Sequence, residues 1–225
     1  MTSFQKALPG RPGMEIPDSR GRSGLDAAGR GLRRNPDVEI TGVEVTSDGW
    51  HVLRRTTYTY RRRDGQRVVE QRETYDRGNG ATVLVYDPLR RTVLLTRQFR
   101  FPAYVNGHVD GMLVEAAAGL LDDDAPDDAI RREAMEELGV TVGELRHVFD
   151  LYMSPGSVTE RVHFYVAAFA ATDKIGPGGG LVDDGEDIEV LEVPFEEALA
   201  MISDGRIVDG KTVILLQWAA IAQLM

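Results

Sequence analysis

The sequence predicts an α/β (α+β) fold, a mixed sheet sandwiched between helices, with an N-terminal antiparallel β-hairpin. Three observations support this fold class. Several short segments alternate apolar and polar residues as strands do, turn-forming pairs such as Asp64-Gly65 separate some of them, and helical segments with clear ends lie between others. Because strands, helices and antiparallel hairpins mix along the chain, the helices are expected to cover a mixed sheet.

Length and composition exclude several classes of protein. The 225 residues, of which 42% are hydrophobic, favour one domain with a sizeable core. The chain has no cysteine, which excludes a disulfide framework, a thiolate nucleophile and cysteine-bound zinc, and which favours a reducing, cytoplasmic location. A formal charge of -10 and the lack of a run of 18 apolar residues argue against nucleic-acid and membrane partners.

Residues 1–38 differ in composition from the rest of the chain. They hold seven lysine or arginine residues, four acidic residues, six glycines and four prolines, and they show no apolar period. We predict a disordered basic arm there, followed by a globular domain over residues 39–225. An RNA-binding role for the arm is the alternative, although a solvated tail is the commoner outcome for such a composition.

The domain is expected to begin with a hairpin region, residues 39–78, and to continue with a core, residues 79–225. In the hairpin region the predicted strands cover residues 38–46, 50–61 and 66–74. Both faces of these strands are polar. The hairpin region should therefore pack on the main body or on a second subunit.

The core contains more apolar strands and three helices. Strands are predicted at residues 81–86, 92–99, 112–117, 145–152 and 161–170, and helices at residues 126–138, 196–204 and 212–224. The first helix has the clearest ends: Pro126 suits a first helical position, Asp127 and Asp128 complement the N-terminus, and Gly139 provides a stop.

The helix at residues 126–138 gathers three carboxylates. At about 100° per residue, Glu133, Glu136 and Glu137 share one arc beside the apolar stripe. Like charges at this spacing oppose helix formation by roughly 0.2–0.5 kcal/mol per pair, and Glu137 lies close to the core side, where desolvation adds a further cost. A bound cation would remove both costs. Oxygen ligands of this kind suit Mg²⁺, with Mn²⁺ as an alternative, and such ions often bridge to substrate phosphates.

A metal held by these glutamates predicts a phosphate-containing substrate. At a diphosphate bond the ion neutralises oxygens, orients an attacking water and lowers its pKa, so that one cluster can serve metal binding and base catalysis together. The alternative is a solvated acidic helix face on which Arg131 and Arg132 form ion pairs.

The histidines indicate no metal site, because none of His51, His108, His147 and His163 shows H-x-x-x-H spacing. The sequence also has no G-x-S-x-G elbow and no P-loop.

Residues 132–140 match the second half of the Nudix box at every fixed position. The first half departs from it, because Gly119 lies 13 residues before Arg132 instead of 14, and the intervening glutamate is absent or replaced by Asp124. In this shortened box the segment resembles the GDP-mannose pyrophosphatase branch of the Nudix hydrolases, which is ADP-ribose pyrophosphatase-like. Further matching segments are residues 75–81, 97–100, 105–107, 118–121, 151–156, 158–160, 178–180, 186–190 and 209–212.

The resemblance implies a Nudix fold and a homodimer that shares the N-terminal hairpin. It implies Mg²⁺-dependent hydrolysis of a nucleoside diphosphate sugar, with GDP-mannose giving GMP and mannose 1-phosphate. Glu133, Glu137, Glu186 and the carbonyl of Ala118 would bind the metal, with Glu136 in or beside the same shell, and the general base is open between Glu186 and a box glutamate. Glu186 falls in the glycine-rich stretch 174–187, which we expect to be a mobile loop, although an ordinary acidic surface loop is the alternative.

Arg100 resembles a family arginine that contacts the diphosphate, a role that suits charge-assisted bonds from arginine to phosphate. Residues three apart in a strand face opposite ways, so at most one of Arg97 and Arg100 should point into the site. The other substrate contacts that the resemblance implies are Trp50, Gln71, Arg72, Glu73, Ala118, Gly119, Leu120, Glu160 and Lys211. Glu160 and Lys211 are equally well explained as turn and helix-start residues. Residues 71–73 would reach the nucleotide of the other subunit, and Trp50, in place of a family tyrosine, can still stack on a purine.

Two other functions stay open from the sequence. ADP-ribose hydrolysis needs the same metal chemistry, because the box acts on the diphosphate and leaves the base and sugar to other loops. The missing upstream glutamate also makes a catalytically inactive nucleotide-sugar binding module conceivable.

Overall fold

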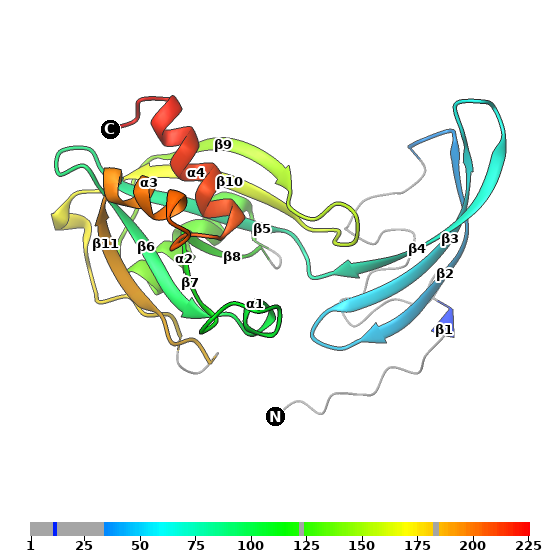
Figure 1. Cartoon of the computed structure of the whole chain (residues 1–225), viewed down its shortest axis with the longest axis horizontal. Coiled ribbons are helices and arrows are strands. Elements are labelled where there is room, and N and C mark those ends of the chain that lie inside the picture. The colour runs from blue at the N-terminus through cyan, green and yellow to red at the C-terminus, as the bar shows by residue number, and fades with distance from the viewer. Residues whose placement is uncertain (1–10, 13–33, 122–123, 182–184) are drawn as a thin grey trace. The chain divides into compact units, whose positions relative to one another are not determined.

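The computed structural model in Figure 1 describes residues 11–12, 34–121, 124–181 and 185–225. The chain forms two compact units. The N-terminal unit comprises Met1–Asn79 and Ser154–Glu160, and the core unit comprises Gly80–Met153 and Arg161–Met225. Most of the predicted basic arm, residues 1–38, lies outside the described residues.

The N-terminal unit is an antiparallel sheet with the strand order β1-β2-β3-β4. Its strands are β1 (Arg11–Pro12), β2 (Val38–Asp48), β3 (Val52–Arg61) and β4 (Arg67–Asp76). The Asp64-Gly65 turn between β3 and β4 is formed as predicted: Gly65 has a φ of 84° and donates its N–H to the carbonyl of Arg62 at 2.9 Å. The three longer strands confirm the strands predicted at residues 38–46, 50–61 and 66–74.

This sheet buries more than its polar sequence suggests. Val43, Val45 and Val52 form a small apolar row, and Arg54 is 1% exposed and pairs with Asp76 at 2.8 Å. A buried arginine is tolerated where a carboxylate neutralises it and accepts its hydrogen bonds. The prediction that both faces are polar was therefore wrong for the end of the sheet near Asp76.

The core unit contains a seven-stranded mixed sheet in the order β11-β6-β5-β10-β9, with β7 paired to β6 and β8 paired to β5. The strands are β5 (Gly80–Asp87), β6 (Thr92–Phe99), β7 (Met112–Glu115), β8 (Ala117–Leu120), β9 (Leu145–Tyr152), β10 (Arg161–Ala168) and β11 (Glu189–Pro194). Strands β5 and β10 are parallel, whereas the other pairs are antiparallel.

Helices cover both faces of this sheet (Figure 1). They are α1 (Phe101–Val105), α2 (Pro126–Leu138), α3 (Phe195–Ser203) and α4 (Gly210–Ile221), together with a short 3-10 turn at Ala171–Asp173. Alternation along β5 sends Val83 and Val85 toward Ile130 of α2, and Leu84 toward Leu215 of α4. The sandwich predicted from the sequence is thereby confirmed.

Three details of the core differ from the sequence-based prediction. Helix α1 and strand β11 were not predicted, because one is only five residues long and the other follows directly on a glycine-rich stretch. The strand predicted at residues 112–117 is split into β7 and β8. At the break, the N–H of Ala116 donates to Oγ1 of Thr212 at 2.7 Å, which ties the sheet to the start of α4.

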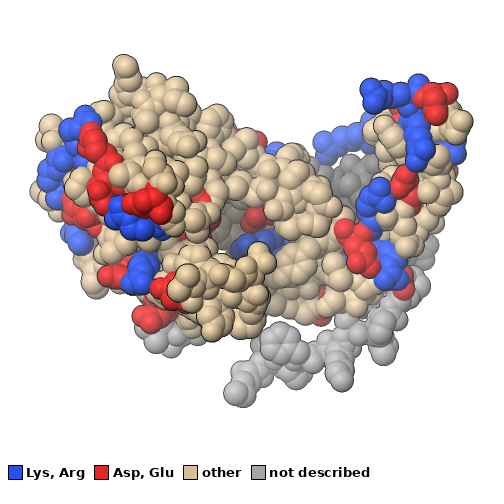
Figure 2. Space-filling view, viewed as in Figure 1, with Lys and Arg blue, Asp and Glu red and all other residues tan. Residues whose placement is uncertain are grey.

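Acidic and basic side chains are interspersed on the face of the core unit that Figure 2 shows. Arg90, for example, pairs with Asp87 at 2.6 Å and with Glu192 at 2.7 Å. Such exposed pairs contribute at most about 1 kcal/mol each. Within the described residues, no helix has the length and apolar character that crossing a membrane requires.

Candidate active site

Helix α2 is fixed to the sheet by its apolar stripe. Ile130, Ala134 and Leu138 are fully buried against the sheet. Pro126 occupies the first turn, and Gly139 ends the helix in a left-handed conformation with a φ of 70°, as the sequence predicted. With these contacts made, the neighbouring arc of glutamates has a fixed direction relative to β8.

Glu137 is the most deeply buried of the box glutamates. It is 2% exposed, and its Oε2 accepts a hydrogen bond from the N–H of Ala118 at 3.1 Å. The side chains of Glu133 and Glu136 are also largely buried. A Cβ added to Gly119 would lie 2.2 Å from the carboxylate of Glu133, so only glycine allows β8 to approach α2 this closely.

The electrostatics of the cluster favour a positive charge. Burial raises the pKa of Glu137 to about 8, the negative charges of Glu133 and Glu186 add to the increase, and the N–H of Ala118 and the charge of Arg100 oppose it. Burial likewise raises the pKa of Glu133, although the charge of Arg132 opposes this. Carboxylates that are costly to ionise alone become good ligands once a divalent cation supplies the charge.

Arg132 forms part of the ion-pair pattern that the sequence left as an alternative. Its Nη1 donates to Glu133 at 2.9 Å and to Glu136 at 3.1 Å. Arg131 does not take part, because its guanidinium donates to the carbonyl of Val142 at 2.6 Å. The carboxylate of Glu136 therefore forms an ion pair with Arg132, whereas that of Glu137 accepts a hydrogen bond from an uncharged backbone N–H.

The glycine-rich segment that leads to Glu186 is hydrogen-bonded to the end of α2. Gly179 donates to the carbonyl of Glu137 at 2.9 Å, and Gly180 donates to that of Glu136 at 3.0 Å. Gly178, with a φ of 69°, approaches so closely that an added Cβ would lie 2.4 Å from the Glu137 carbonyl. Leu181, the residue after Gly180, donates its N–H to Oε2 of Glu186 at 2.8 Å, and the charge of Glu186 raises the pKa of both Glu133 and Glu137. Mobility of this segment stays a prediction.

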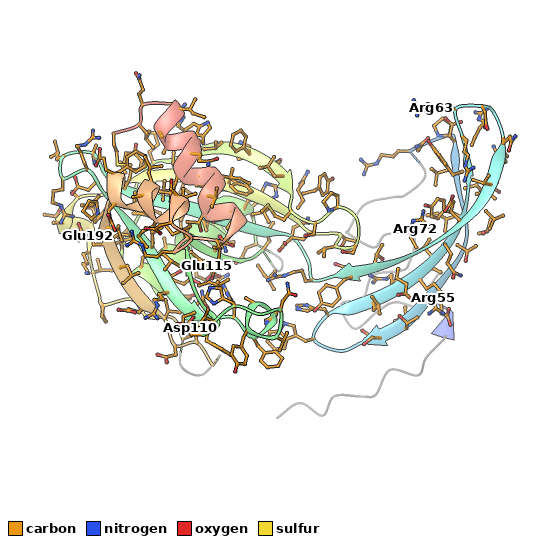
Figure 3. All side chains as sticks on the ribbon, viewed as in Figure 1. Arg55, Arg63, Arg72, Asp110, Glu115 and Glu192 are labelled. Atoms are coloured by element: carbon orange, nitrogen blue, oxygen red, sulfur yellow. The ribbon has the colours of Figure 1, made fainter. Side chains whose placement is uncertain are left out.

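A buried carboxylate that the sequence did not single out organises the cationic side of the site. Glu115, which Figure 3 labels, is 4% exposed and forms ion pairs with Arg100 at 2.7 Å and with Lys211 at 2.9 Å. Lys211 also pairs with Asp209, the N-cap of α4, at 3.0 Å. Arg97 pairs instead with Glu189 at 3.3 Å. The side chains of Arg97 and Arg100 therefore have different partners, as predicted, and of these two arginines only Arg100 pairs with Glu115.

Arg100 and Glu186 line the same open pocket, which has a volume of about 360 Å³. Its other lining residues are Gln98, Phe99, Met112, Gly185 and Asp187. A basic and an acidic residue thus line one hollow of the core unit. That combination suits an anionic substrate bound together with a cation.

Of the remaining predicted substrate contacts, Leu120 is the last residue of β8 in the core unit, and the others belong to the N-terminal unit. Trp50 is 79% exposed. The others make local contacts: Gln71 with Thr57, Arg72 with Glu70, Glu73 with Arg55, and Glu160 with Arg77. Figure 3 labels Arg55 and Arg72 on this sheet. These side chains are mostly exposed and polar.

Two family models together match residues 37–215 of this chain. Residues 76–215 match the NUDIX domain, and residues 37–75 match the GDP-mannose pyrophosphatase NudK N-terminal domain. The chain belongs to the Nudix hydrolase family, as the shortened box predicted. Nudix hydrolases generally depend on a divalent metal ion.

Within this family the chain is similar to several proteins named GDP-mannose pyrophosphatase. The relative from Pectobacterium atrosepticum is 53% identical over 184 residues, which is 82% of this chain and 94% of the relative. The relative from Klebsiella pneumoniae is 53% identical over 189 residues, covering 84% and 94%. The relative from Salmonella typhimurium is 51% identical over 188 residues, covering 84% and 97%.

Proposed function

We propose that this enzyme hydrolyses the diphosphate bond of a nucleoside diphosphate sugar, with GDP-mannose as the substrate and GMP and mannose 1-phosphate as the products. The observation that carries the reaction type is the buried carboxylate of Glu137 beside Glu133 on the Nudix helix. The names of the similar proteins support the choice of GDP-mannose.

The proposed metal ligands are Glu133, Glu137, Glu186 and the carbonyl of Ala118, with Glu136 beside them. This set fits Mg²⁺, and Mn²⁺ as a second choice, because every ligand atom is oxygen and the deepest carboxylate, that of Glu137, accepts a hydrogen bond from an uncharged donor, the N–H of Ala118. When bound, the ion would neutralise oxygens of the diphosphate and lower the pKa of a water molecule.

The chain's own residues would bind and orient the substrate. Arg100 would bind the diphosphate through charge-assisted hydrogen bonds, and Lys211 would contact the nucleotide sugar. Glu115 would hold the side chains of Arg100 and Lys211 in place, since it forms an ion pair with each of them. The proton of the attacking water would pass to Glu186 or to a box glutamate that is not coordinated at that moment, because a coordinated carboxylate is a poor base. Gly119 and Leu120 would line the site next to Ala118.

The N-terminal unit supplies the second part of the proposal. Residues 71–73, Trp50 and Glu160 would contact the nucleotide, and the sheet would be shared in a homodimer. Val69 and Trp50 are 72% and 79% exposed, so both side chains are accessible to a ligand or to a second subunit. We place the start of the catalytic core at residue 79. The cytoplasmic location stays a prediction from the cysteine-free composition.

A substrate panel tests the proposed function. Purified protein is incubated with GDP-mannose, GDP-glucose and ADP-ribose in parallel, each with Mg²⁺ and with EDTA, and the products are identified by chromatography. We expect preferential release of GMP from GDP-mannose that EDTA abolishes. Preference for ADP-ribose would reject the substrate assignment, and binding of GDP-mannose without any hydrolysis would indicate an inactive binding module.

A further inference from the structure

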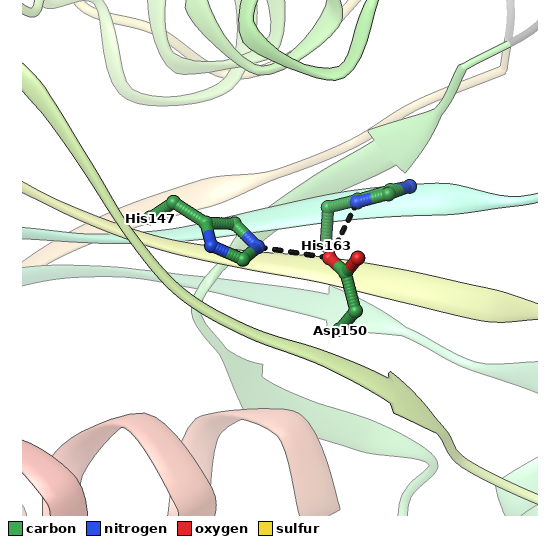
Figure 4. Close-up of side chains that lie close together, drawn as sticks. All are labelled: His147, Asp150 and His163. Atoms are coloured by element: carbon green, nitrogen blue, oxygen red, sulfur yellow. Dashed lines mark hydrogen bonds and ion pairs between the residues drawn. The ribbon is translucent and has the colours of Figure 1, made fainter.

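Two histidines and an aspartate meet on the β9–β10 hairpin of the core unit, outside the carboxylate site. Nε2 of His147 lies 2.8 Å from Oδ1 of Asp150, and Nδ1 of His163 lies 2.6 Å from the same oxygen (Figure 4). The three potential ligand atoms all lie within 4.8 Å of one another. We propose that His147, Asp150 and His163 form a second metal site, selective for Zn²⁺ and similar transition metals.

A β-bulge creates this arrangement. Phe164 pairs with Phe149, but the next residue of β10, Tyr165, pairs with His147, so that Val148 is the extra residue of β9. In a regular strand, His147 and Asp150 would face opposite sides of the sheet, since they are three residues apart. The bulge turns His147 to the side of Asp150, while Val148 and Phe149 both pack against the core on the other face.

His163 is placed on this side by its pairing with Asp150 across the two strands. Strand alternation puts it on the same face as Tyr165, whose hydroxyl donates to Asp127 of α2 at 2.6 Å. His163 is largely buried, whereas the side chains of His147 and Asp150 are open to solvent. The three side chains thus form a half-open cage, which leaves room for a water molecule as a fourth ligand.

The donor set selects the class of metal. Two imidazoles and one carboxylate are characteristic ligands of Zn²⁺ and related ions, whereas Mg²⁺ prefers oxygen alone. Tetrahedral bonds of about 2.1 Å place neighbouring ligand atoms about 3.4 Å apart, so an ion can enter if the side chains rotate slightly. Asp150 faces both histidines through one carboxylate oxygen, whereas Arg161 lies 4.0 Å from its second oxygen.

The consequence for the fold is a crosslink at the sheet edge. In the order of the described strands, β9 lies at the end of the sheet next to β10. A Zn²⁺ ion bound to both strands would stabilise their pairing, because an ion that binds only the folded state shifts the unfolding equilibrium by mass action.

The test is a Zn²⁺ titration of the full-length, tag-free, metal-stripped protein by calorimetry, with Mg²⁺ in large excess. We expect His147→Gln and Asp150→Asn each to lose one equivalent of Zn²⁺ binding or to weaken it at least about tenfold. His108→Gln, a histidine outside the cluster whose Nδ1 accepts from Gly111, is the matched control and should bind as the wild type does. Zn²⁺ should also raise the melting temperature of the wild type but not of His147→Gln.

A second measurement needs no substitution. The imidazole NMR signals of His147 and His163 should shift on addition of Zn²⁺, while those of His51 and His108 stay in place. Equal Zn²⁺ stoichiometry and affinity in the wild type and both cluster variants, or unchanged signals of the two cluster histidines, would overturn the proposal and leave a hydrogen-bonded His–Asp–His cluster.

Discussion

Glu137 combines deep burial with a position in the middle of a carboxylate cluster. Burial and the charges of Glu133 and Glu186 favour its protonated form, whereas the proposed reaction needs its carboxylate as a metal ligand. The conflict disappears when a divalent ion is bound. In the metal-free protein, ionisation of Glu137 should therefore lower the free energy of unfolding.

That cost predicts a specific pH dependence. The pKa of Glu137 is about 8 in the folded protein against an ordinary value of 4.5. The folded state therefore binds the extra proton, and its stabilising effect is complete below the ordinary pKa and is lost as the pH rises through about 8. In EDTA, the wild type should lose free energy of unfolding relative to Glu137→Gln as the pH rises from 4.5 to about 8. Urea unfolding measures both proteins, and parallel pH profiles would show that Glu137 is not the titrating group.

Glu115 is expected to act as a positioning residue. In Glu115→Gln, Arg100 and Lys211 keep a hydrogen-bond partner but lose the buried charge that fixes both. Loss of a charged partner costs about 1–3 kcal/mol, so kcat/KM should fall by about one to two orders of magnitude. Glu197→Gln, which removes an exposed partner of Arg206, is the control. An unchanged kcat/KM in Glu115→Gln would show that Glu115 does not position Arg100 and Lys211 for catalysis.

The sequence reveals these two glutamates to very different degrees. The box glutamates were predictable because helical periodicity alone places Glu133, Glu136 and Glu137 on one arc. Glu115 was not, because its partners Arg100 and Lys211 lie 15 and 96 positions away in the chain. Contacts over such separations are set by strand pairing and by the docking of α4, which no local pattern encodes.

At the scale of elements, α2 and the glycine segment behave as one structural unit. The backbone N–H groups of Gly179 and Gly180 donate to carbonyls of the last turn of α2, and Leu181, the next residue, donates its N–H to Oε2 of Glu186 at 2.8 Å. The sequence predicted α2 with its correct bounds, 126–138, because Pro126 and Gly139 mark both ends. For the glycine-rich residues the sequence predicted only a loop, because their close approach to α2 depends on tertiary packing.

Two glycines of this segment provide a matched test. Gly178→Ala should destabilise the protein by more than about 1 kcal/mol, because alanine is strained at a φ of 69° and its Cβ would meet the carbonyl of Glu137. Gly176→Ala is the control, since nothing lies within 4 Å of its added Cβ. Free energies of unfolding and Mg²⁺ affinities measure the effect. Equal values for the two variants would show that the segment is not anchored to α2.

The same scale explains why the His–Asp–His cluster was missed. His147 and His163 are 16 residues apart and lack any spacing typical of a metal site in sequence. They meet because β9 and β10 pair antiparallel and because a bulge at Val148 reorients one of them. Hairpin pairing was predictable from the alternation of the two strands, whereas a bulge of one residue was not.

At the scale of the whole molecule, the net charge of -10 is spread over many mixed pairs, and the basic arm opposes it in sign. The core unit holds the carboxylate cluster, the pocket with Arg100 and the buried Glu115–Lys211 pair. The predicted arm contributes none of these residues. Catalysis should therefore not depend on it.

Deletion of residues 1–33 tests that expectation. The shortened protein should retain kcat/KM for GDP-mannose within about twofold, since every proposed metal ligand and substrate contact lies beyond the deleted residues. Steady-state kinetics at matched Mg²⁺ concentration measure it. A collapse of activity with the fold intact would mean that the domain boundary was misplaced and that the arm takes part in the site.

The most direct test of the central claim is the Mg²⁺ dependence of GDP-mannose hydrolysis by the wild type, Glu137→Gln and Glu144→Gln. Glu144 is exposed and lies just beyond α2, so its variant controls for the loss of one negative charge. We predict that Glu137→Gln loses at least about a hundredfold in kcat at saturating Mg²⁺ while Glu144→Gln matches the wild type. Equal rates in all three proteins, with intact folds, would contradict a metal site built on Glu137.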